Sequence, residues 1–200
     1  MELILIAIAA ILLLVLCLLT VSTLITGMSP MPSSKNARSA MLNQLEWLDQ
    51  LHHIEHQQVI GIKSCDQLSP VLELGCGWGG LLMAVSEKYP NRRVIGYEMS
   101  WVPWLVSWLR LKLAGRRQVK VLRKNFYKAS WPDQSILFCY LSPTLMQQLQ
   151  DKVEKEEHVQ GLISNTFALS KSEAVNTLQL KDLYHTKIYT YQFQQNTSSD

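Results

Sequence analysis

The sequence predicts an α/β fold, in which a mostly parallel sheet carries helices on both faces and follows one long apolar helix. Three observations lead to this prediction. Apolar runs typical of buried strands alternate with helix-periodic segments from Val71 to Phe193. A glycine cluster joins the first of these strands to the helix after it. An uncharged run of 23 residues, Leu3 to Ile25, stands ahead of both.

The stretch V-L-E-L-G-C-G-W-G-G, Val71 to Gly80, is the centre of the predicted domain. A buried strand ends at Leu74, and a helix follows from Leu81 to Lys88. Glycines at such a bend let a ligand lie against the backbone, and the N–H groups of a helix N-terminus attract nucleotides and carboxylates. We therefore expect a nucleotide-cofactor site at this bend.

The glycine spacing fits two classes of cofactor. The dinucleotide fingerprint G-x-G-x-x-G is met by Gly75, Gly77 and Gly80. An acidic-x-G-x-G-x-G pattern, which resembles the first motif of the class I S-adenosylmethionine methyltransferases, is met by Glu73, Gly75, Gly77 and Gly79. Glu73 favours the second class, because its carboxylate repels a pyrophosphate and attracts the ammonium of a methionine moiety. A nicotinamide or flavin enzyme remains the alternative.

The run Leu3 to Ile25 is long enough to cross a hydrocarbon core of about 30 Å as a helix. A cleaved signal peptide would carry a basic n-region and a shorter apolar stretch, whereas Glu2 stands here instead. We predict an uncleaved anchor over 1–27 and a linker over 28–35. The first charges after the span are basic, so we expect a single-pass protein of the inner (plasma) membrane with a cytoplasmic domain.

The charge pattern predicts no nucleic-acid partner, because the net charge is only +3 and no Lys/Arg block is long. The densest basic cluster, from Arg110 to Lys124, is either a solvated face or a contact with anionic lipid headgroups. The four cysteines form no C-x-x-C pair, and we expect all of them to be free thiols: Cys17, Cys65, Cys76 and Cys139.

A lead-in region over 36–68 precedes the predicted main domain, 69–193, and begins with an amphipathic helix, Asn36 to Gln58. This helix contains the pattern H-x-x-E-H at His52 to His56, which in zinc proteases places two histidines and a base on one helix. No later helix supplies an evident third ligand, so we interpret the pattern as a polar helix face and predict no metal.

The second strand of the domain, Arg93 to Glu98, ends in an acid. Parallel strand–helix–strand topology places Glu98 beside the glycine loop, where it can accept hydrogen bonds from both ribose hydroxyls. Ser100 is expected to cap the next helix, Trp101 to Ala114, which is apolar on nearly every side. Either the tryptophans of this helix touch the membrane interface or the lead-in helix covers them.

Two further strand ends complete the predicted site. After the strand Gln118 to Leu122, we expect Asn125 to accept from the adenine amine and Phe126 to pack on the ring. After the strand Ser135 to Tyr140, the residues expected nearest the reacting methyl group are Tyr140, Ser142 and Pro143. The remaining predicted elements are a helix over Thr144 to Glu157, strands over Val159 to Ser164, Leu178 to Leu180 and Lys187 to Phe193, and a polar tail over 194–200.

From Ser69 to Phe193 the chain resembles small bacterial class I methyltransferases related to the lysine methyltransferases of the ATP synthase c-subunit. The motifs that carry the resemblance are V-L-E-L-G-C-G-W-G-G, V-I-G-Y-E-M-S, Y-L-S-P-T-L-M and I-S-N-T-F. The resemblance implies a Rossmann-like class I fold with a seven-stranded sheet. The residues that it and the motifs above assign to S-adenosylmethionine are Glu73, Gly75, Cys76, Gly77, Gly79, Glu98, Met99, Asn125 and Phe126.

The chain departs from that family at three places. Asn125 replaces the usual aspartate, Trp101-Val102 resembles an insertion, and no Trp-x-Pro follows Phe167. The function that the resemblance implies is N-methylation of a protein lysine, which the predicted anchor places near the membrane. A lipid, quinone or small-molecule O-methyltransferase, an NAD-binding oxidoreductase and a non-catalytic cofactor-binding module are the alternatives.

Overall fold

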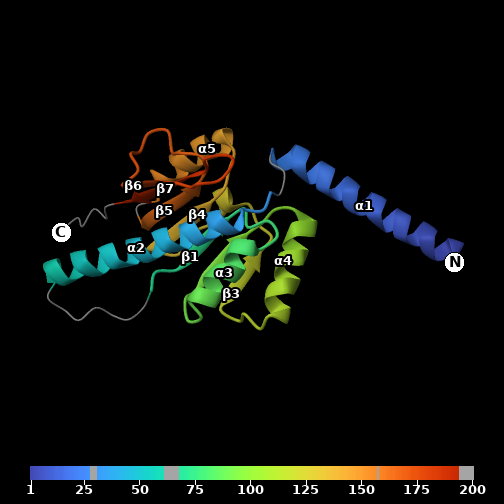
Figure 1. Ribbon diagram of the computed structural model, residues 1–200, viewed down its shortest axis with the longest axis horizontal. Coiled ribbons are helices and arrows are strands. Elements are labelled where there is room, and N and C mark those ends of the chain that lie inside the picture. Colours follow the sequence, from blue (N-terminus) through green and yellow to red (C-terminus); the bar gives the residue numbers. More distant parts are fainter. Residues whose placement is uncertain (28–30, 61–67, 157, 194–200) are drawn as a thin grey trace.

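The computed structural model describes residues 1–27, 31–60, 68–156 and 158–193, without the side chains of 53 and 55–60. Seven strands form one sheet in the order β3-β2-β1-β4-β5-β7-β6. Strands β1 to β5 are parallel, and β7 runs antiparallel to β5 and β6. The predicted α/β fold with a mostly parallel seven-stranded sheet is therefore confirmed (Figure 1).

Alternating strands and helices follow two N-terminal helices. The bounds are α1 Glu2–Thr26, α2 Lys35–Ile60, β1 Val71–Leu74, α3 Gly80–Lys88, β2 Val94–Tyr97, α4 Trp101–Leu113, β3 Val119–Leu122, β4 Ser135–Cys139, α5 Pro143–Val153, β5 Val159–Asn165, β6 Asn176–Gln179 and β7 Lys187–Gln192. A short 3₁₀ turn, η1, covers Phe126–Lys128 between β3 and β4.

Several elements differ by a few residues from their predicted bounds, and two of these differences have a clear physical cause. The helix α5 ends at Val153 rather than at Glu157, because the acidic side chains that follow are unfavourable at the negative end of a helix dipole. Strand β6 begins at Asn176, two residues earlier than predicted, because Asn176 pairs with Thr190 and donates to Gln44 over 3.0 Å.

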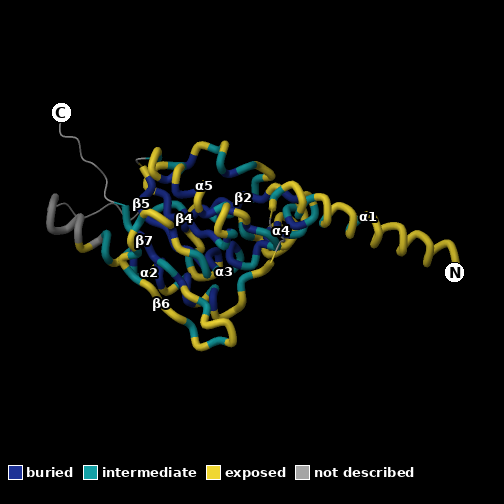
Figure 2. The backbone as a smooth tube through the Cα atoms, turned by 90° about the horizontal axis from the view of Figure 1, so that it is seen from above, coloured by how far each residue is buried: buried dark blue, intermediate teal, exposed yellow. Residues whose placement is uncertain are grey.

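Two core layers hold the domain together, one on each face of the sheet. On one face α2 and α3 pack against side chains such as Val71 and Phe138. On the other face α5 packs against their neighbours in sequence, such as Leu72 and Leu137. Successive residues of a strand point to opposite faces, so strands covered on both sides are continuously apolar. Figure 2 shows this buried interior beside the helix α1, which is exposed along most of its length.

The helix α2 is an integral part of this core. Met41, Leu45 and Leu48 belong to the first layer, and Asp49 binds the buried Arg92 through two hydrogen bonds of 2.6 and 3.0 Å. Its main contacts are with β5, β7 and α3. The alternative in which this lead-in helix covers the tryptophans of α4 is therefore wrong.

Candidate functional site

A cavity of about 710 Å³ opens at the carboxyl ends of β1, β2 and β4. The strand order reverses between β1 and β4, and ligands of open α/β sheets bind at such a reversal. Nine of the twelve predicted site residues line this cavity: Glu73, Gly75, Cys76, Gly77, Glu98, Met99, Asn125, Phe126 and Tyr140.

Three residues of the glycine loop after β1 have positive φ angles, a backbone conformation that favours glycine. Gly75, Gly77 and Gly79 have φ values of 77°, 50° and 73°, in the left-handed region. The backbone N–H groups of Gly75 and Cys76 donate to the carbonyl of Tyr97 over 2.9 and 2.8 Å, so β2 holds the loop in place. A Cβ on Gly77 would meet nothing within 4 Å, which leaves room for a ligand against this part of the backbone.

Gly79 has a different task from the other loop glycines. It does not line the cavity, and a Cβ there would lie 2.8 Å from the Cβ of Ser107 in α4. Arg110, also in α4, donates to the carbonyl of Trp78 over 2.7 Å. Gly79 therefore lets α4 pack closely on the loop.

Glu98 is buried directly beside the glycine loop, where β2 ends. Its Oε2 accepts from the N–H of Gly77 over 2.8 Å, and its Oε1 accepts from the N–H of Ser100 over 2.8 Å. Ser100 is the N-cap residue of α4, as predicted, but its side chain makes no capping hydrogen bond and accepts one from Ser22 of α1. The carboxylate is thus fixed at the loop with lone pairs left for two hydroxyl donors.

Glu73 lies one strand away from Glu98 and has a different environment. Its Oε2 is buried without a hydrogen-bond partner. Burial raises the pKa of Glu73 well above its ordinary value; a hydrogen bond from the Leu82 N–H lowers it, Glu98 raises it and Arg38 lowers it. A buried carboxylate with one unpartnered oxygen at a cavity is a place where a cationic group would be stabilised.

Arg38 lines the cavity, although the sequence did not point to it as a site residue. Its guanidinium lines the cavity from α2 and lies so near the start of α3 that a Cβ on Gly80 would be 3.2 Å from Nη1. The same Nη1 donates to the carbonyl of Ser33 over 2.5 Å. A guanidinium beside a helix N-terminus favours a carboxylate, but no local pattern links Arg38 to a loop about 40 residues later.

The remaining predicted residues are distributed as follows. Asn125 uses its Oδ1 to accept from the N–H of Tyr127 over 2.8 Å, so the oxygen expected to meet the adenine amine already caps η1. Phe126 is buried beside it. Ser142 and Pro143 do not line the cavity; they form the N-cap and first residue of α5, next to Tyr140, which does.

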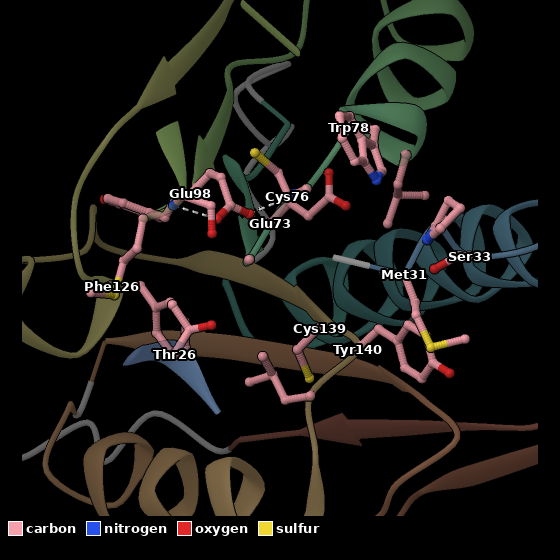
Figure 3. A pocket seen from close by; sticks show the side chains of 18 of the residues that line it. Thr26, Met31, Ser33, Glu73, Cys76, Trp78, Glu98, Phe126, Cys139 and Tyr140 are labelled. Carbon is pink, nitrogen blue, oxygen red and sulfur yellow. Dashed lines mark hydrogen bonds between the residues drawn. The ribbon is translucent and has the colours of Figure 1, made fainter. Parts of the chain in front are cut away.

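One wall of the cavity comes from outside the predicted domain. Leu24, Ile25, Thr26 and Gly27 at the end of α1 line it, together with the segment 31–33. Figure 3 shows side chains from this segment, from the glycine loop and from the strand ends around the same space. The sequence predicted a short linker but gave no sign that the linker and helix end enter the site.

Burial disfavours the thiolate form of the two cysteines of the site. Burial raises the pKa of Cys76 well above its ordinary value, with Glu73 and Glu98 adding to the rise, and burial raises the pKa of Cys139 to about 12. Both are free thiols, as is Cys17, in agreement with the prediction; Cys65 lies outside the described residues. The side chains of His53, Glu55 and His56 in the H-x-x-E-H pattern also lie outside them.

Comparison with known proteins decides between the two cofactor classes. The family model of the ANTKMT methyltransferase domain matches residues 73–176, which is more than half of the chain. The chain belongs to the ANTKMT methyltransferase domain family. The domain is therefore an S-adenosylmethionine-dependent methyltransferase, and the oxidoreductase alternative is excluded.

A curated relative of this family is the adenine nucleotide translocase lysine N-methyltransferase of Mus musculus. It is 31% identical over 103 residues, which are 50% of this chain and 44% of the mouse protein. The matched region thus spans less than half of that relative.

Solved structures support the class I fold. An RNA methyltransferase from Salinibacter ruber in complex with S-adenosyl-L-homocysteine superposes with a TM-score of 0.65 and 17% identity, over 85% of this chain and 98% of that one. Precorrin-6y C5,15-methyltransferase from Geobacter metallireducens GS-15 gives a TM-score of 0.58 and 15% identity, over 82% and 90%. At these identities the likeness shows the fold alone.

The residues that line the cavity fit S-adenosylmethionine, the methyl donor. The unpartnered oxygen of Glu73 suits its ammonium, and the Arg38 guanidinium at the start of α3 suits its carboxylate. The open space over Gly77 and the carboxylate of Glu98 suit its ribose. The residues present therefore suit the amino-acid tail and the ribose of the cofactor.

Proposed function

We propose that this protein is a membrane-anchored methyltransferase that N-methylates a protein lysine at the membrane surface. The observation that carries the proposal is the shared cavity: one wall is the glycine loop with Glu73, and the opposite wall includes the end of α1, Leu24 to Gly27. An acceptor that reaches the cofactor would pass beside the end of the apolar helix.

The anchoring part of the proposal rests on α1. This helix of 25 residues is long and apolar enough to cross a bilayer, and none of its residues is buried in the protein. At ~1.5 Å per residue it measures about 37 Å, which exceeds a hydrocarbon core of about 30 Å. Its exposure argues against a core helix. We propose a single-pass anchor over 1–27, a linker over 28–35 and a cytoplasmic domain on the inner (plasma) membrane.

The proposed domain layout assigns the cavity residues to two regions of the chain. The lead-in region over 36–68 contributes Arg38 to the cavity, and the domain over 69–193 contributes the loop and the strand ends. The tail over 194–200 has no assigned role.

The chemistry asks the protein to hold and align its two substrates. S-adenosylmethionine supplies a methyl group on a sulfonium, a leaving group that is already activated. Glu73, Arg38 and Glu98 fix its charged and hydroxyl groups. Tyr140 lies at the end of β4 on the rim of the cavity, and Ser142 and Pro143 start α5 and fix that segment. We assign to these three the alignment of the acceptor nitrogen at about 3 Å from the methyl group.

A lysine acceptor must lose its proton before it attacks. Apolar lining residues such as Leu24, Ile25 and Met31 favour the neutral amine, because desolvation lowers the pKa of a lysine. No side chain is assigned as general base. The mouse relative is named for a lysine substrate, which supports lysine over the lipid or quinone hydroxyl of the alternative.

The test is to incubate membranes that contain the full chain with radiolabelled S-adenosylmethionine, then to separate protein from lipid. Label in protein that is recovered as methyl-lysine after hydrolysis supports the proposal. Label in the lipid fraction would replace it with O-methylation of an amphiphile, and label in neither fraction would overturn it. A Glu98→Ala variant, which is expected to bind the cofactor much more weakly, supplies the background.

A further inference from the structure

We propose that the outer face of α4 docks on an anionic bilayer surface and orients the cavity toward the membrane. Five exposed apolar side chains lie along this face: Trp101, Leu105, Trp108, Leu109 and Leu113. They are named here the α4 stripe. Their spacing of three or four residues places them on one side of the helix, while Ser107 and Leu111 face the protein and are buried.

The α4 stripe is exposed enough to need a partner. Trp101 is 57% exposed and Leu113 is 79% exposed. Contiguous apolar surface of this kind marks a protein or membrane contact. Indole is favoured at the interface between water and lipid, where its ring is apolar and its N–H remains polar.

The charge of the segment that contains α4 indicates which partner the α4 stripe has. The segment from Trp101 to Lys128 carries eight of the chain's 19 lysines and arginines and none of its 16 acidic residues. Elsewhere the acidic residues outnumber the basic ones, so the positive net charge of the chain comes from this segment alone. Juxtamembrane cations attract anionic headgroups.

The cations lie against the apolar stripe. The Arg123 guanidinium stands 3.9 Å from the ring centre of Trp101, and the Lys112 ammonium stands 4.7 Å from that of Trp108. Around them Arg117, Lys120 and Lys124 are exposed. Apolar side chains beside cations match the boundary where acyl chains meet anionic headgroups.

The position of α4 agrees with this partner. Both overall views show α4 at the end of the domain where α1 is attached (Figures 1 and 2). Ser22 of α1 donates to Ser100 at the start of α4, so the proposed anchor and the proposed docking face are adjacent. This inference rests on the anchoring part of the proposed function.

Because α4 contacts the glycine loop directly, docking at α4 would also affect the cofactor site. Arg110 of α4 bonds the Trp78 carbonyl, and Ser107 packs on Gly79. A bilayer that holds α4 therefore also holds the glycine loop relative to the membrane.

The test uses the full chain in vesicles, with Cys17 and Cys65 replaced by serine and a nitroxide label on Leu105→Cys. A label on Leu183→Cys is the matched control, since Leu183 is 86% exposed on the connection between β6 and β7. On vesicles of phosphatidylcholine with phosphatidylglycerol, we expect the label at 105 to be relaxed several-fold more by oxygen, relative to a water-soluble nickel chelate, than the label at 183. Changing Arg117, Lys120 and Lys124 to glutamine should reduce that ratio.

Three outcomes would overturn the docking proposal. In the first, the label at 105 is as accessible to the nickel chelate as the label at 183 on the vesicles that contain phosphatidylglycerol. In the second, an RNA oligonucleotide shields 105 and vesicles do not. In the third, spin–spin broadening reveals a second copy on this face. Alkaline extraction tests the anchor independently of docking. Protein that is stripped from the vesicles disproves the anchor. Protein that is retained, but whose label at 105 remains accessible to water, disproves docking alone.

Discussion

The two walls of the cavity differ in how they are built. The wall with Glu98 and the glycine loop is held by hydrogen bonds from the loop backbone to the Glu98 carboxylate and the Tyr97 carbonyl. The wall with Leu24 to Gly27 and 31–33 is brought in from the end of α1, and Ser33 accepts hydrogen bonds from Asn165 over 3.3 Å and from Arg38 over 2.5 Å. The first wall suits a cofactor of fixed shape, and the second suits acceptor selection.

The largest effect is expected at Glu98, on the wall with the glycine loop. Glu98→Ala should weaken binding of S-adenosylhomocysteine about a hundredfold, because each hydrogen bond to a charged group contributes ~1.5–3 kcal/mol. Calorimetry with the full chain in detergent measures this. Glu46→Ala is the control, since Glu46 is half-exposed and binds only Lys88 at the surface. Equal affinities for the two variants would remove Glu98 from the site.

A second prediction separates packing from backbone strain in the same wall. Gly79→Ala places a Cβ 2.8 Å from that of Ser107, whereas Gly115→Ala has a similar φ, +69° against +73°, and meets nothing within 4 Å. We expect Gly115→Ala to cost about 1 kcal/mol of unfolding free energy and Gly79→Ala about 3 kcal/mol. Chemical denaturation compares them, and equal losses would show that Gly79 is needed for its φ alone.

The third prediction concerns the junction between the two walls. Arg38→Gln should weaken S-adenosylhomocysteine binding about tenfold, since one charge-assisted contact to the carboxylate is lost. Arg38→Lys should retain part of the affinity that Arg38→Gln loses. Lys35→Gln removes the same charge from an exposed position of the same helix and should change nothing. If Lys35→Gln weakened S-adenosylhomocysteine binding as much as Arg38→Gln, the effect would come from net charge and not from the position of Arg38.

The two walls also differ in what the sequence could reveal. Glu73, the glycines and Glu98 stand at fixed offsets from strands whose apolar pattern is local, and parallel topology then brings their ends together. Arg38 and the end of α1 enter the site through the packing of α2 on the sheet and of α1 on α4, which no periodicity encodes. The assignment of Asn125 to adenine could not foresee that its oxygen caps η1.

The smallest expected effect is the pH dependence set by Glu73. Burial raises its pKa in the folded protein above 4.5, so the folded state binds more protons than the unfolded state from that pH upward. Stability from this group is present below pH 4.5 and is lost as pH rises through the folded pKa. The unfolding free energy of Glu73→Gln relative to the wild type should therefore increase with pH. A constant difference between pH 4 and 8 would contradict the buried, unpartnered state.

The central claim is that Glu73 selects a cationic amino-acid tail over a diphosphate, and calorimetry with two ligands tests it most directly. We predict that the wild type binds S-adenosylhomocysteine and not NAD, that binding of S-adenosylhomocysteine releases a proton from Glu73, and that Glu73→Gln loses both the affinity and the proton release. Tight binding of NAD by the wild type, with no response to S-adenosylhomocysteine, would contradict the account.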